Sequence, residues 1–296
     1  MSDSPRSVPD WVARLITHAR EVDGAPPFSD QGLVDYRTGA RELVAIDEAG
    51  AALVTPSLPS SGSGSVSAVE AEFVVDPDAR GRGNGTRLLE TLLSRAEGEL
   101  LVWAHGDHPA ARALAASHGL TPVRELLHLQ LRIEPVEIPP GSHLGGELSA
   151  GSTRRIDPFI AGADEDDWIA LNALIFASHP EQGSITRADL ELLEAEPWFE
   201  ATNFFILRDG DAMIGYCWLK VEGDGGEFYV VGVHPDRQGE KLGSLLFEAG
   251  LARLRELGIR QAHLYVEGDN EPALGLYRSR GFTQDSIDIQ YRSHLS

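Results

Sequence analysis

The sequence predicts an α/β protein of two tandem domains, each a mostly antiparallel mixed sheet flanked by helices. Two observations indicate this fold class. The chain has 296 residues, of which 42% are hydrophobic, and this is enough apolar material for two cores. Strand-like and helix-like segments also follow one another in the same order twice along the chain.

The repeat is visible in two matched pairs of segments. The stretch "AEFVVDPDARGRGNGTRLLETLLSRA" matches "FYVVGVHPDRQGEKLGSLLFEAGLARL", with Gly85 on Gly243, an offset of 243 − 85 = 158. Further on, "GDHPAARALAASHGLTPV" matches "GDNEPALGLYRSRGFTQD", with Gly119 on Gly281, an offset of 281 − 119 = 162. Two ordered matches at nearly equal offset indicate a tandem duplication.

Periodicity and turn residues place the elements of the first copy. Apolar residues at helical spacing predict the helices, short apolar runs predict the strands, and the turn at Glu48–Gly50 joins two of those strands. The low-complexity "SLPSSGSGSVS" is a flexible connector. In chain order we expect helices 10–22 and 29–38, strands 41–47, 51–57 and 69–75, helix 84–97, strand 99–104, helix 108–118 and strand 123–133.

The segment 134–151 is rich in Pro and Gly, lacks periodicity and separates the two copies. We therefore expect an N-terminal domain at 1–138, a linker at 139–151 and a C-terminal domain at 152–296. In the second copy the same signals predict strand 153–157, helices 164–177 and 186–195, strands 203–208, 212–221 and 226–233, helix 242–257, strand 260–267, helix 271–280 and strand 283–291.

Composition narrows the classes of function. The formal charge of −21 and the pI near 4.8 argue against a nucleic-acid partner, since phosphate backbones need a basic face. No apolar stretch suits a membrane span or a signal peptide, so we expect a cytoplasmic protein. The single cysteine, Cys217, excludes an intramolecular disulfide and lies in an apolar run, where an inert core thiol is expected. His179 and the pair His105 and His108 lack further ligands at suitable spacing, so no metal is expected.

The glycine-containing loop before each long helix suits a pyrophosphate. Glycine lets the backbone approach a ligand closely, and the helix N-terminus supplies free N–H groups and a positive dipole end. Gly-rich turns also begin many helices for structural reasons, so one copy alone is weak evidence. In "QGEKLG" Lys241 replaces the middle glycine of "RGRGNG". We expect Lys241 in the first helical turn with a negative φ, where it costs nothing and its ammonium can reach a phosphate.

Both copies resemble the Gcn5-related N-acetyltransferase (GNAT) superfamily, in which this loop holds acetyl-coenzyme A. The run Asn270, Ala273, Leu276, Tyr277, Gly281 and Phe282 follows the superfamily pattern "N-x-x-A-x-x-L-Y-x-x-x-G-F". The stretches "HPEQG", "GEFYVVGVHP", "LYVEGDN" and "WAHGDHPAARALA" resemble, more closely, the mycothiol synthase family of actinobacteria. That family consists of tandem GNAT enzymes that acetylate the cysteinyl amine of desacetylmycothiol, and the resemblance spans most of the chain. It implies acetyl-coenzyme A and desacetylmycothiol as the partners.

Acetyl transfer to an amine needs a base for the amine and an acid for the leaving thiolate. Glu227 begins the strand "EFYVV" and is the candidate base, on the strand face of Tyr229 and Val231. Tyr277 is the candidate acid, as the resemblance implies. The offsets place Val69 and Ala115 at these positions in the first copy, so we expect a catalytic C-terminal domain and a degenerate, non-catalytic N-terminal one. The structural alternatives are that Glu227 is an exposed carboxylate at a strand edge and that Tyr277 is a tyrosine packed between its helix and the sheet.

The remaining site residues follow from the loops and from the resemblance. Val231–Val233 are expected to offer backbone groups to the acetyl carbonyl and the pantetheine arm, with a bulge at Gly232 that splays the strand. The expected coenzyme contacts of the second copy are Val231, Gly232, Val233, Gln238, Gly239, Glu240, Lys241, Leu242, Gly243, Ser244, Asn270, Glu271, Pro272, Ala273, Leu274 and Gly275. Those of the first copy are Val74, Val75, Asp76, Arg82, Gly83, Asn84, Gly85, Thr86 and Arg87. The resemblance implies acceptor contacts from Asp30, Glu181, Lys220, Glu227 and Tyr265.

The sequence is also compatible with other functions. The acceptor could be another small-molecule or peptide amine, and the protein could instead be a non-catalytic acetyl-coenzyme A sensor. Asp30 stands where the family pattern has Glu, and Lys220 and Glu181 also suit solvated charges. Because two fused copies already supply the pairing that single-domain relatives find by dimerising, a monomer is expected.

Overall fold

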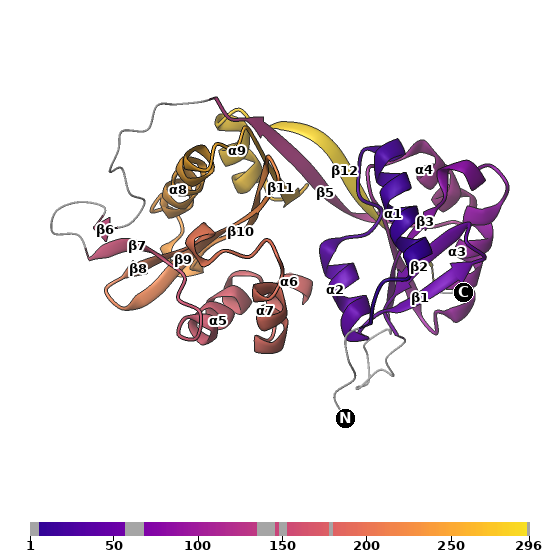
Figure 1. Ribbon diagram of the computed structural model, residues 1–296, viewed down its shortest axis with the longest axis horizontal. Coiled ribbons are helices and arrows are strands. Elements are labelled where there is room, and N and C mark those ends of the chain that lie inside the picture. Colours follow the sequence, from indigo (N-terminus) through magenta and orange to yellow (C-terminus); the bar gives the residue numbers. More distant parts are fainter. Residues whose placement is uncertain (1–5, 57–67, 135–145, 148–152, 178–179, 295–296) are drawn as a thin grey trace. The chain divides into compact units, whose positions relative to one another are not determined.

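The computed structural model describes residues 6–56, 68–134, 146–147, 153–177 and 180–294 (Figure 1). The predicted connector at 57–67, His179 and most of the predicted linker lie outside these residues. The chain divides into two compact units. Unit 1 comprises Met1–Leu127, Glu267–Asn270 and Asp285–Ser296, and unit 2 comprises His128–Val266 and Glu271–Gln284.

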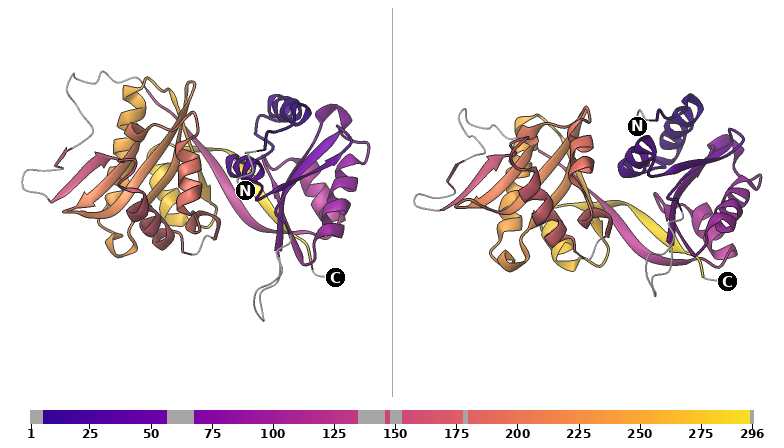
Figure 2. Two further views of the ribbon diagram at one scale, coloured as in Figure 1. Left: turned by 60° about the horizontal axis from the view of Figure 1, so that its bottom comes forward. Right: turned by 90° about the horizontal axis from the view of Figure 1, so that it is seen from below.

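Unit 1 is a mixed sheet with helices on both faces (Figure 2). Its strand order is β1-β2-β3-β4-β12; β1, β2 and β3 form an antiparallel meander, β3 pairs with β4 in parallel, and β4 pairs antiparallel with β12. Helices α1 and α2 pack on one face through Val12, Leu15 and Tyr36, and α3 packs on the other through Leu88 and Leu92. The elements are α1 (Asp10–Asp23), α2 (Asp30–Thr38), β1 (Glu42–Ile46), β2 (Gly50–Val54), β3 (Ala68–Val75), α3 (Asn84–Arg95), β4 (Glu99–Ala104) and α4 (Pro109–Ser117).

Unit 2 repeats this plan. Its strand order is β5-β11-β10-β9-β8-β7-β6, in which the β6–β10 neighbours pair antiparallel and β10 pairs with β11 in parallel. An aromatic core around Trp168 and Trp218 joins α5 and α7 to one face, while Phe247 of α8 stacks on Phe228 on the other. The elements are β5 (Thr121–Arg132), β6 (Gly146–Glu147), β7 (Arg154–Pro158), α5 (Glu165–Ile175), α6 (Pro180–Gly183), α7 (Arg187–Glu194), β8 (Phe204–Asp209), β9 (Ala212–Glu222), β10 (Gly225–Val233), α8 (Leu242–Glu256), β11 (Gln261–Glu267), α9 (Glu271–Ser279) and β12 (Thr283–Arg292).

The last strand of each copy is divided between the units. Residues of β12 from Asp285 onward belong to unit 1, and residues of β5 from His128 onward belong to unit 2. The predicted domains are contiguous, so the units differ from them in this respect. Alternating apolar residues predict a strand but do not say which sheet edge it joins.

The predicted mixed α/β fold is confirmed, with most element boundaries within one or two residues of those expected. The predicted helix 242–257, for example, is α8. The four-residue α6 and the short β6 were not predicted, because each is too brief to carry a periodic signal. Within the described residues, no helix is both long enough and apolar enough to cross a membrane.

Candidate active site

The parallel strand pair of unit 2 opens toward its C-terminal end. Strand β10 pairs with β11 over Gly225–Glu227 and Gln261–His263, although both strands continue beyond these residues. The same occurs in unit 1, where β3 and β4 pair over Ala68–Glu72 and Glu99–Trp103. Each unit therefore has two strand ends that separate just before a glycine-containing loop and the N-terminus of a helix.

A β-bulge in β10 decides which side chains share a face. The register with β9 shifts between Phe228 and Val230, so that Glu227 lies opposite Lys220 and Val230 lies opposite Trp218. Since paired residues point to the same face, Glu227 shares its face with Tyr229 and Val230. The expectation that it also shares a face with Val231 is wrong, because the extra residue reverses the alternation.

The predicted bulge at Gly232 is also wrong, because the register there is regular. The glycine has another cause. A Cβ at this position would lie 2.8 Å from Ile175 Cδ1 and 2.9 Å from Tyr216 Cζ. Gly232 is therefore required by close packing beneath the strand, three residues beyond the register shift.

Lys241 occupies the left-handed conformation, with φ 60° and ψ 19°, directly before α8. In unit 1 the matching residue is Gly83, with φ 80°, and the loop glycines Gly81 and Gly239 have φ 71° and 82°. The expected negative φ is therefore wrong. The two loops have one backbone shape, and unit 2 holds a lysine where that shape favours glycine.

The strain at Lys241 makes a direct prediction. Lys241→Gly raises the free energy of unfolding of unit 2 by roughly 0.5–1 kcal/mol, because a left-handed L-residue costs about 1–2 kcal/mol and glycine returns part of this as lost entropy. For the coenzyme expected at this loop, the affinity falls modestly, because an ammonium is removed. Hydrogen exchange of the α8 peptides and a coenzyme titration measure the two effects. The reciprocal Gly83→Lys is the matched control and destabilises unit 1; a destabilised Lys241→Gly would contradict the assigned backbone.

Glu240, the other charged residue of this loop, is held by arginines. Its carboxylate pairs with Arg237 at 2.7 Å and also with Arg154, and these arginines hold the pKa of Glu240 below its usual value. Arg237 in turn pairs with Asp209 at 2.7 Å. The charge of Glu240 is thus neutralised by its own neighbours.

Glu227 lies among polar and aromatic side chains of β9, β10 and β11. Its side chain is 14% exposed, and its Oε2 lies 3.5 Å from Nε2 of His263. Lys220, opposite it in register, has Nζ 3.1 Å from Glu222 and 5.2 Å from the centre of the Trp198 ring. His263 was not singled out from the sequence, although its place in the strand "HLYVE" beside the predicted base gave a signal.

The other predicted acceptor residues of unit 2 are Tyr265 and Glu181. Tyr265 lies two residues beyond His263 on β11, so both side chains project from the same face; it is exposed and stacks on His128 at 4.8 Å. Glu181 belongs to α6, but its side chain lies outside the part of the chain described. Helix α6 is tied to the core by Asn172, which donates to the Gln182 carbonyl at 2.6 Å and accepts from Tyr216 at 2.7 Å.

Tyr277 lies on the other side of the sheet from Glu227. Its ring packs between Phe247 and Phe282, at 5.5 and 6.0 Å, on the face covered by α8. Burial raises the pKa of Tyr277 to about 12, with a smaller contribution from Cys217. The phenol therefore stays protonated at neutral pH. Cys217 itself is fully buried, and burial raises the pKa of its thiol well above the usual range, as expected of an inert core cysteine.

The strand register also identifies the true counterpart of Glu227 in unit 1. Glu227 pairs with His263 and Glu70 pairs with Leu101, and His263 and Leu101 differ by 263 − 101 = 162. The counterpart is therefore Glu70, and the expected Val69 is wrong because the constant offset ignored the bulge. Unit 1 does have a carboxylate here, but Arg41 binds it at 2.7 Å. Ala115 still replaces Tyr277, since α4 and α9 keep the offset of 162 at both ends.

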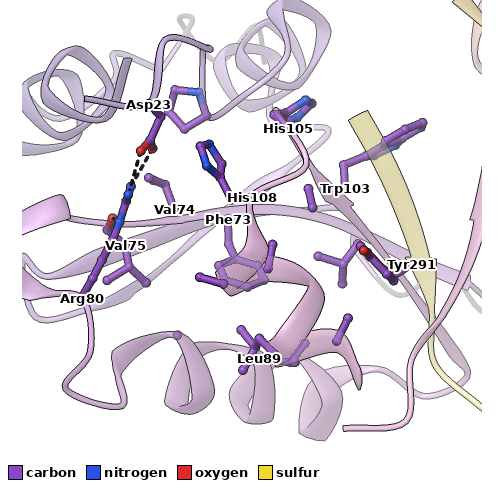
Figure 3. A pocket seen from close by; sticks show the side chains of 18 of the residues that line it. Asp23, Phe73, Val74, Val75, Arg80, Leu89, Trp103, His105, His108 and Tyr291 are labelled. Atoms are coloured by element: carbon purple, nitrogen blue, oxygen red, sulfur yellow. Dashed lines mark hydrogen bonds and ion pairs between the residues drawn. The ribbon is translucent and has the colours of Figure 1, made fainter. Parts of the chain in front are cut away.

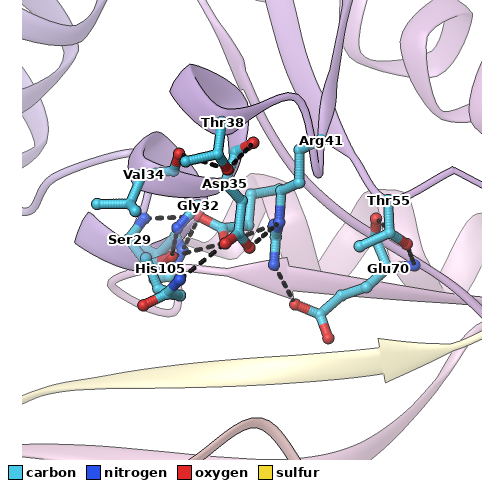
Figure 4. A network of polar contacts seen from close by, with 11 residues as sticks. Ser29, Gly32, Val34, Asp35, Thr38, Arg41, Thr55, Glu70 and His105 are labelled. Atoms are coloured by element: carbon cyan, nitrogen blue, oxygen red, sulfur yellow. Dashed lines mark hydrogen bonds and ion pairs between the residues drawn. The ribbon is translucent and has the colours of Figure 1, made fainter. Parts of the chain in front are cut away.

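Arg41 belongs to a buried network of alternating charges (Figure 4). It also binds Glu72 at 2.9 Å, and Glu72 accepts from the Ser29 amide at 2.6 Å and lies 3.3 Å from His105. His105 in turn lies 2.8 Å from Asp288. From the sequence, His105 was considered only as a metal ligand. Glu70 and Glu72, two residues apart on one face of β3, nevertheless indicated that a cation lies beside them.

The charges of this network hold one another in the ionised state. Burial alone raises the pKa of Glu72, but the hydrogen bond and charge of His105 and the charge of Arg41 lower it to about 2. Burial likewise lowers the pKa of His105, but its hydrogen bonds to Asp288 and Glu72 raise it to about 10. His105 is therefore an imidazolium at neutral pH.

Unit 1 contains a pocket of about 600 Å³ between the separated ends of β3 and β4, the glycine loop and α4 (Figure 3). Five of the predicted coenzyme residues line it, namely Val74, Val75, Gly83, Gly85 and Thr86. Asp76, Arg82, Asn84 and Arg87 do not line it; Asn84 instead donates to the Ala79 carbonyl at 3.0 Å. Lining residues that were not predicted include Phe73, Arg80, His105 and His108, and Arg80 forms two hydrogen bonds to Asp23, at 2.7 and 2.6 Å.

Comparison with known proteins identifies the same family in both copies of the repeat. The model of the acetyltransferase (GNAT) family matches residues 44–120 and 168–282, one segment in each copy. Mycothiol acetyltransferases of Clavibacter michiganensis subsp. michiganensis and Sanguibacter keddieii are 45% and 44% identical, over 95% and 94% of this chain and 90% and 91% of theirs.

Two solved structures share the fold over nearly the whole chain. A tandem GNAT protein from the clavulanic acid biosynthesis pathway has a TM-score of 0.67 at 18% identity, covering 99% of this chain and 98% of that one. A GCN5-related N-acetyltransferase from Sphaerobacter thermophilus has a TM-score of 0.64 at 20% identity, covering 97% and 96%. The tandem arrangement expected from the internal repeat is thus confirmed.

Proposed function

The chain belongs to the acetyltransferase (GNAT) family, and on that premise we propose that it moves the acetyl group of acetyl-coenzyme A onto the cysteinyl amine of desacetylmycothiol. The acceptor is proposed from the mycothiol acetyltransferases, which match this chain over nearly its full length. The observation that supports the chemistry is the placement of Glu227 and Tyr277 on opposite faces of a strand pair that separates at Glu227.

The reaction then runs through the gap between β10 and β11. Glu227, through a water, takes a proton from the ammonium, and the nitrogen attacks the thioester carbon. Backbone amides at Val231–Val233 stabilise the oxyanion. The C–N bond forms first and gives a tetrahedral intermediate, from which the C–S bond then breaks. Tyr277 gives its proton to the leaving sulfur, and the second proton of the nitrogen leaves through water and restores the phenol. A base is needed because an α-amine with a pKa of about 7.7–8.0 is mostly protonated at neutral pH.

The coenzyme is held by the loop and the helix N-terminus that follow β10. Amides from Gln238 to Ser244 face a pyrophosphate at the positive end of α8, and Asn270–Gly275 flank the pantetheine arm. In unit 1 the intact "RGRGNG" and the pocket beside it support binding of a second coenzyme thioester. We propose that unit 1 does not turn it over, because Glu70 is bound by Arg41 and Ala115 has no hydroxyl.

The acceptor is proposed to lie over the Glu227 face of unit 2. A hydroxylated amino-sugar inositol suits Glu227, Lys220 and Tyr265, which carry a carboxylate, an ammonium and a phenol on neighbouring strands. Glu181 and the exposed Asp30 of α2 remain proposed contacts by family resemblance. Asp30 reaches one methylene less far than the glutamate of the family pattern.

A panel of amines tests the acceptor. Release of the coenzyme A thiol is measured with desacetylmycothiol, cysteine, glucosamine, a polyamine and a peptide with a free N-terminus. We expect kcat/KM to be highest for desacetylmycothiol, by about 100-fold or more, since a site built to bind several hydroxyls rejects amines that lack them. Equal rates across the panel would show a general N-acetyltransferase, and no thiol release would show a binding protein.

A further inference from the structure

Three aromatic residues that fill the core of unit 2 beside α8 are replaced in unit 1. Phe247, Tyr277 and Phe282 lie within 5.5, 5.7 and 6.0 Å of one another. The offsets give their counterparts as Leu89 (247 − 158), Ala115 (277 − 162) and Leu120 (282 − 162). Unit 1 therefore has two leucines and an alanine where unit 2 has three rings.

All three replacements line the 600 Å³ pocket of unit 1. Two larger residues offset part of the lost volume: Phe73 stands for Val231 (231 − 158) and Tyr291 for Leu129 (291 − 162), and both also line the pocket. A pocket of about 600 Å³ remains although Phe73 and Tyr291 are larger than their counterparts. Figure 3 shows Leu89 reaching up from α3 toward Phe73, with Tyr291 to one side and the polar residues Asp23, Arg80 and His108 elsewhere on the rim.

We propose that unit 1 binds coenzyme A thioesters whose acyl group is longer than acetyl, with an uncharged acyl chain in the space between Leu89, Ala115 and Leu120. This rests on the proposed function, in which unit 1 holds the coenzyme at its glycine loop. In the proposed mechanism the phenol of Tyr277 in unit 2 lies next to the thioester sulfur. Unit 1 has Ala115 at this position, and the smaller side chain leaves space next to the sulfur. The chain is uncharged because the wall is apolar there, with Val102 and Leu114 completing it.

The thioester stays intact in this site. Transfer needs a base and an acid at the thioester carbon, and the structure gives unit 1 neither in working form. Glu70 is bound by Arg41, which is itself buried against Glu72, and Ala115 has no proton to give. Unit 1 is thus a site for an acyl-coenzyme A that is bound and released unchanged, whereas unit 2 is restricted to a small acyl group by its three rings.

The affinity should rise with chain length in a measurable way. Burial of one methylene stabilises binding by about four-fold, the equivalent of roughly 0.8 kcal/mol. Butanoyl-coenzyme A carries two methylenes more than acetyl-coenzyme A, so its Kd at unit 1 is expected to be about 15-fold lower. The gain stops when the chain reaches the end of the pocket.

Isothermal titration of the full chain with acetyl-, butanoyl- and hexanoyl-coenzyme A tests this. We expect two sites, of which one tightens from acetyl to butanoyl and the other does not. The variant Leu89→Phe with Ala115→Tyr and Leu120→Phe carries the residues of unit 2 and should lose the gain while two acetyl-coenzyme A sites remain. Ala115→Leu fills part of the space with less risk to folding and should lose most of the gain. Ala113→Leu, an exposed position of the same helix, is the matched control and should keep it.

The outcomes separate this inference from the proposed function. If two sites bind and neither binds the longer thioesters more tightly, the inference alone is overturned. A single site for every thioester would overturn it together with the proposed binding of coenzyme by unit 1. A gain that survives Ala115→Leu, or that is lost equally in Ala113→Leu, would show that the chain does not lie in this pocket.

Discussion

Replacement of Glu227 by glutamine is expected to lower kcat for acetyl transfer by about 10²- to 10⁴-fold, the contribution of a positioned general base. The amide keeps the size of the side chain on β10 but cannot accept the proton of the ammonium. The deficit should narrow as the pH rises above about 8, because the free α-amine then needs no base. Steady-state thiol release from pH 6 to 10 measures both effects, and a purely structural role for Glu227 would give a deficit independent of pH.

The matched control is Glu222→Gln. Glu222 is a largely exposed carboxylate on β9, with its side chain 63% exposed and 3.1 Å from Lys220. The substitution Glu222→Gln removes one negative charge from the neighbourhood of Lys220 and Glu227. We expect kcat to stay within about two-fold of the wild-type value. The assigned roles would be wrong if Glu227→Gln and Tyr277→Phe each left turnover unchanged.

The bulge in β10 shows what a sequence can and cannot give at this site. The repeat, the loops and the residue types of the proposed base and acid were all readable, because they depend on local pattern. The strand register could not be predicted, because a single extra residue at Tyr229 does not change the apolar pattern or the composition of the strand. Its effect reached beyond the strand: it moved the counterpart of Glu227 from Val69 to Glu70 and the face of Val231 to the other side.

The network of unit 1 was missed for a related reason. Arg41, Glu72, His105 and Asp288 come from four distant parts of the chain. Asp288 reaches unit 1 because β12 ends there, and the partner of an edge strand is set by tertiary packing rather than by its own alternation. The left-handed φ of Lys241 belongs to the same class. Loop shape is shared between the two copies, and it overrides the residue's own preference.

The buried network also predicts how the stability of unit 1 depends on pH. The folded pKa of His105 is raised to about 10 from an ordinary value of 6.5. Its contribution is therefore fully present below pH 6.5 and is lost as the pH rises through about 10. For Glu72 the folded pKa is lowered to about 2 from 4.5, so its contribution is present above pH 4.5 and is lost as the pH falls through about 2. Unit 1 should therefore be most stable between about pH 4.5 and pH 6.5.

The alkaline limb should disappear when His105 is replaced by glutamine. We expect the wild type to lose about 3 kcal/mol of local stability in unit 1 between pH 6.5 and 10, and His105→Gln to start lower by a similar amount at pH 6.5. The variant leaves Glu72 and Asp288 buried without the cation that lies between them, and this is the costly case for an ion network. Arg41 still binds Glu72, so the loss stays short of complete unfolding.

Hydrogen exchange of the β3 and β4 peptides measures this unit by itself, which a single unfolding transition of a two-unit chain does not. His118→Gln is the control, because His118 lies at the end of α4 in unit 1 and outside the network. Its Nδ1 lies 3.0 Å from the Leu114 carbonyl oxygen, and its Nε2 lies 3.9 Å from Glu90. It should keep the alkaline limb. If His118→Gln removes the limb, or if His105→Gln retains it, the proton does not reside on His105. An unchanged stability at pH 6.5 in His105→Gln would instead mean that Glu72 and Asp288 find other partners, and the network would be a consequence of folding rather than a support for it.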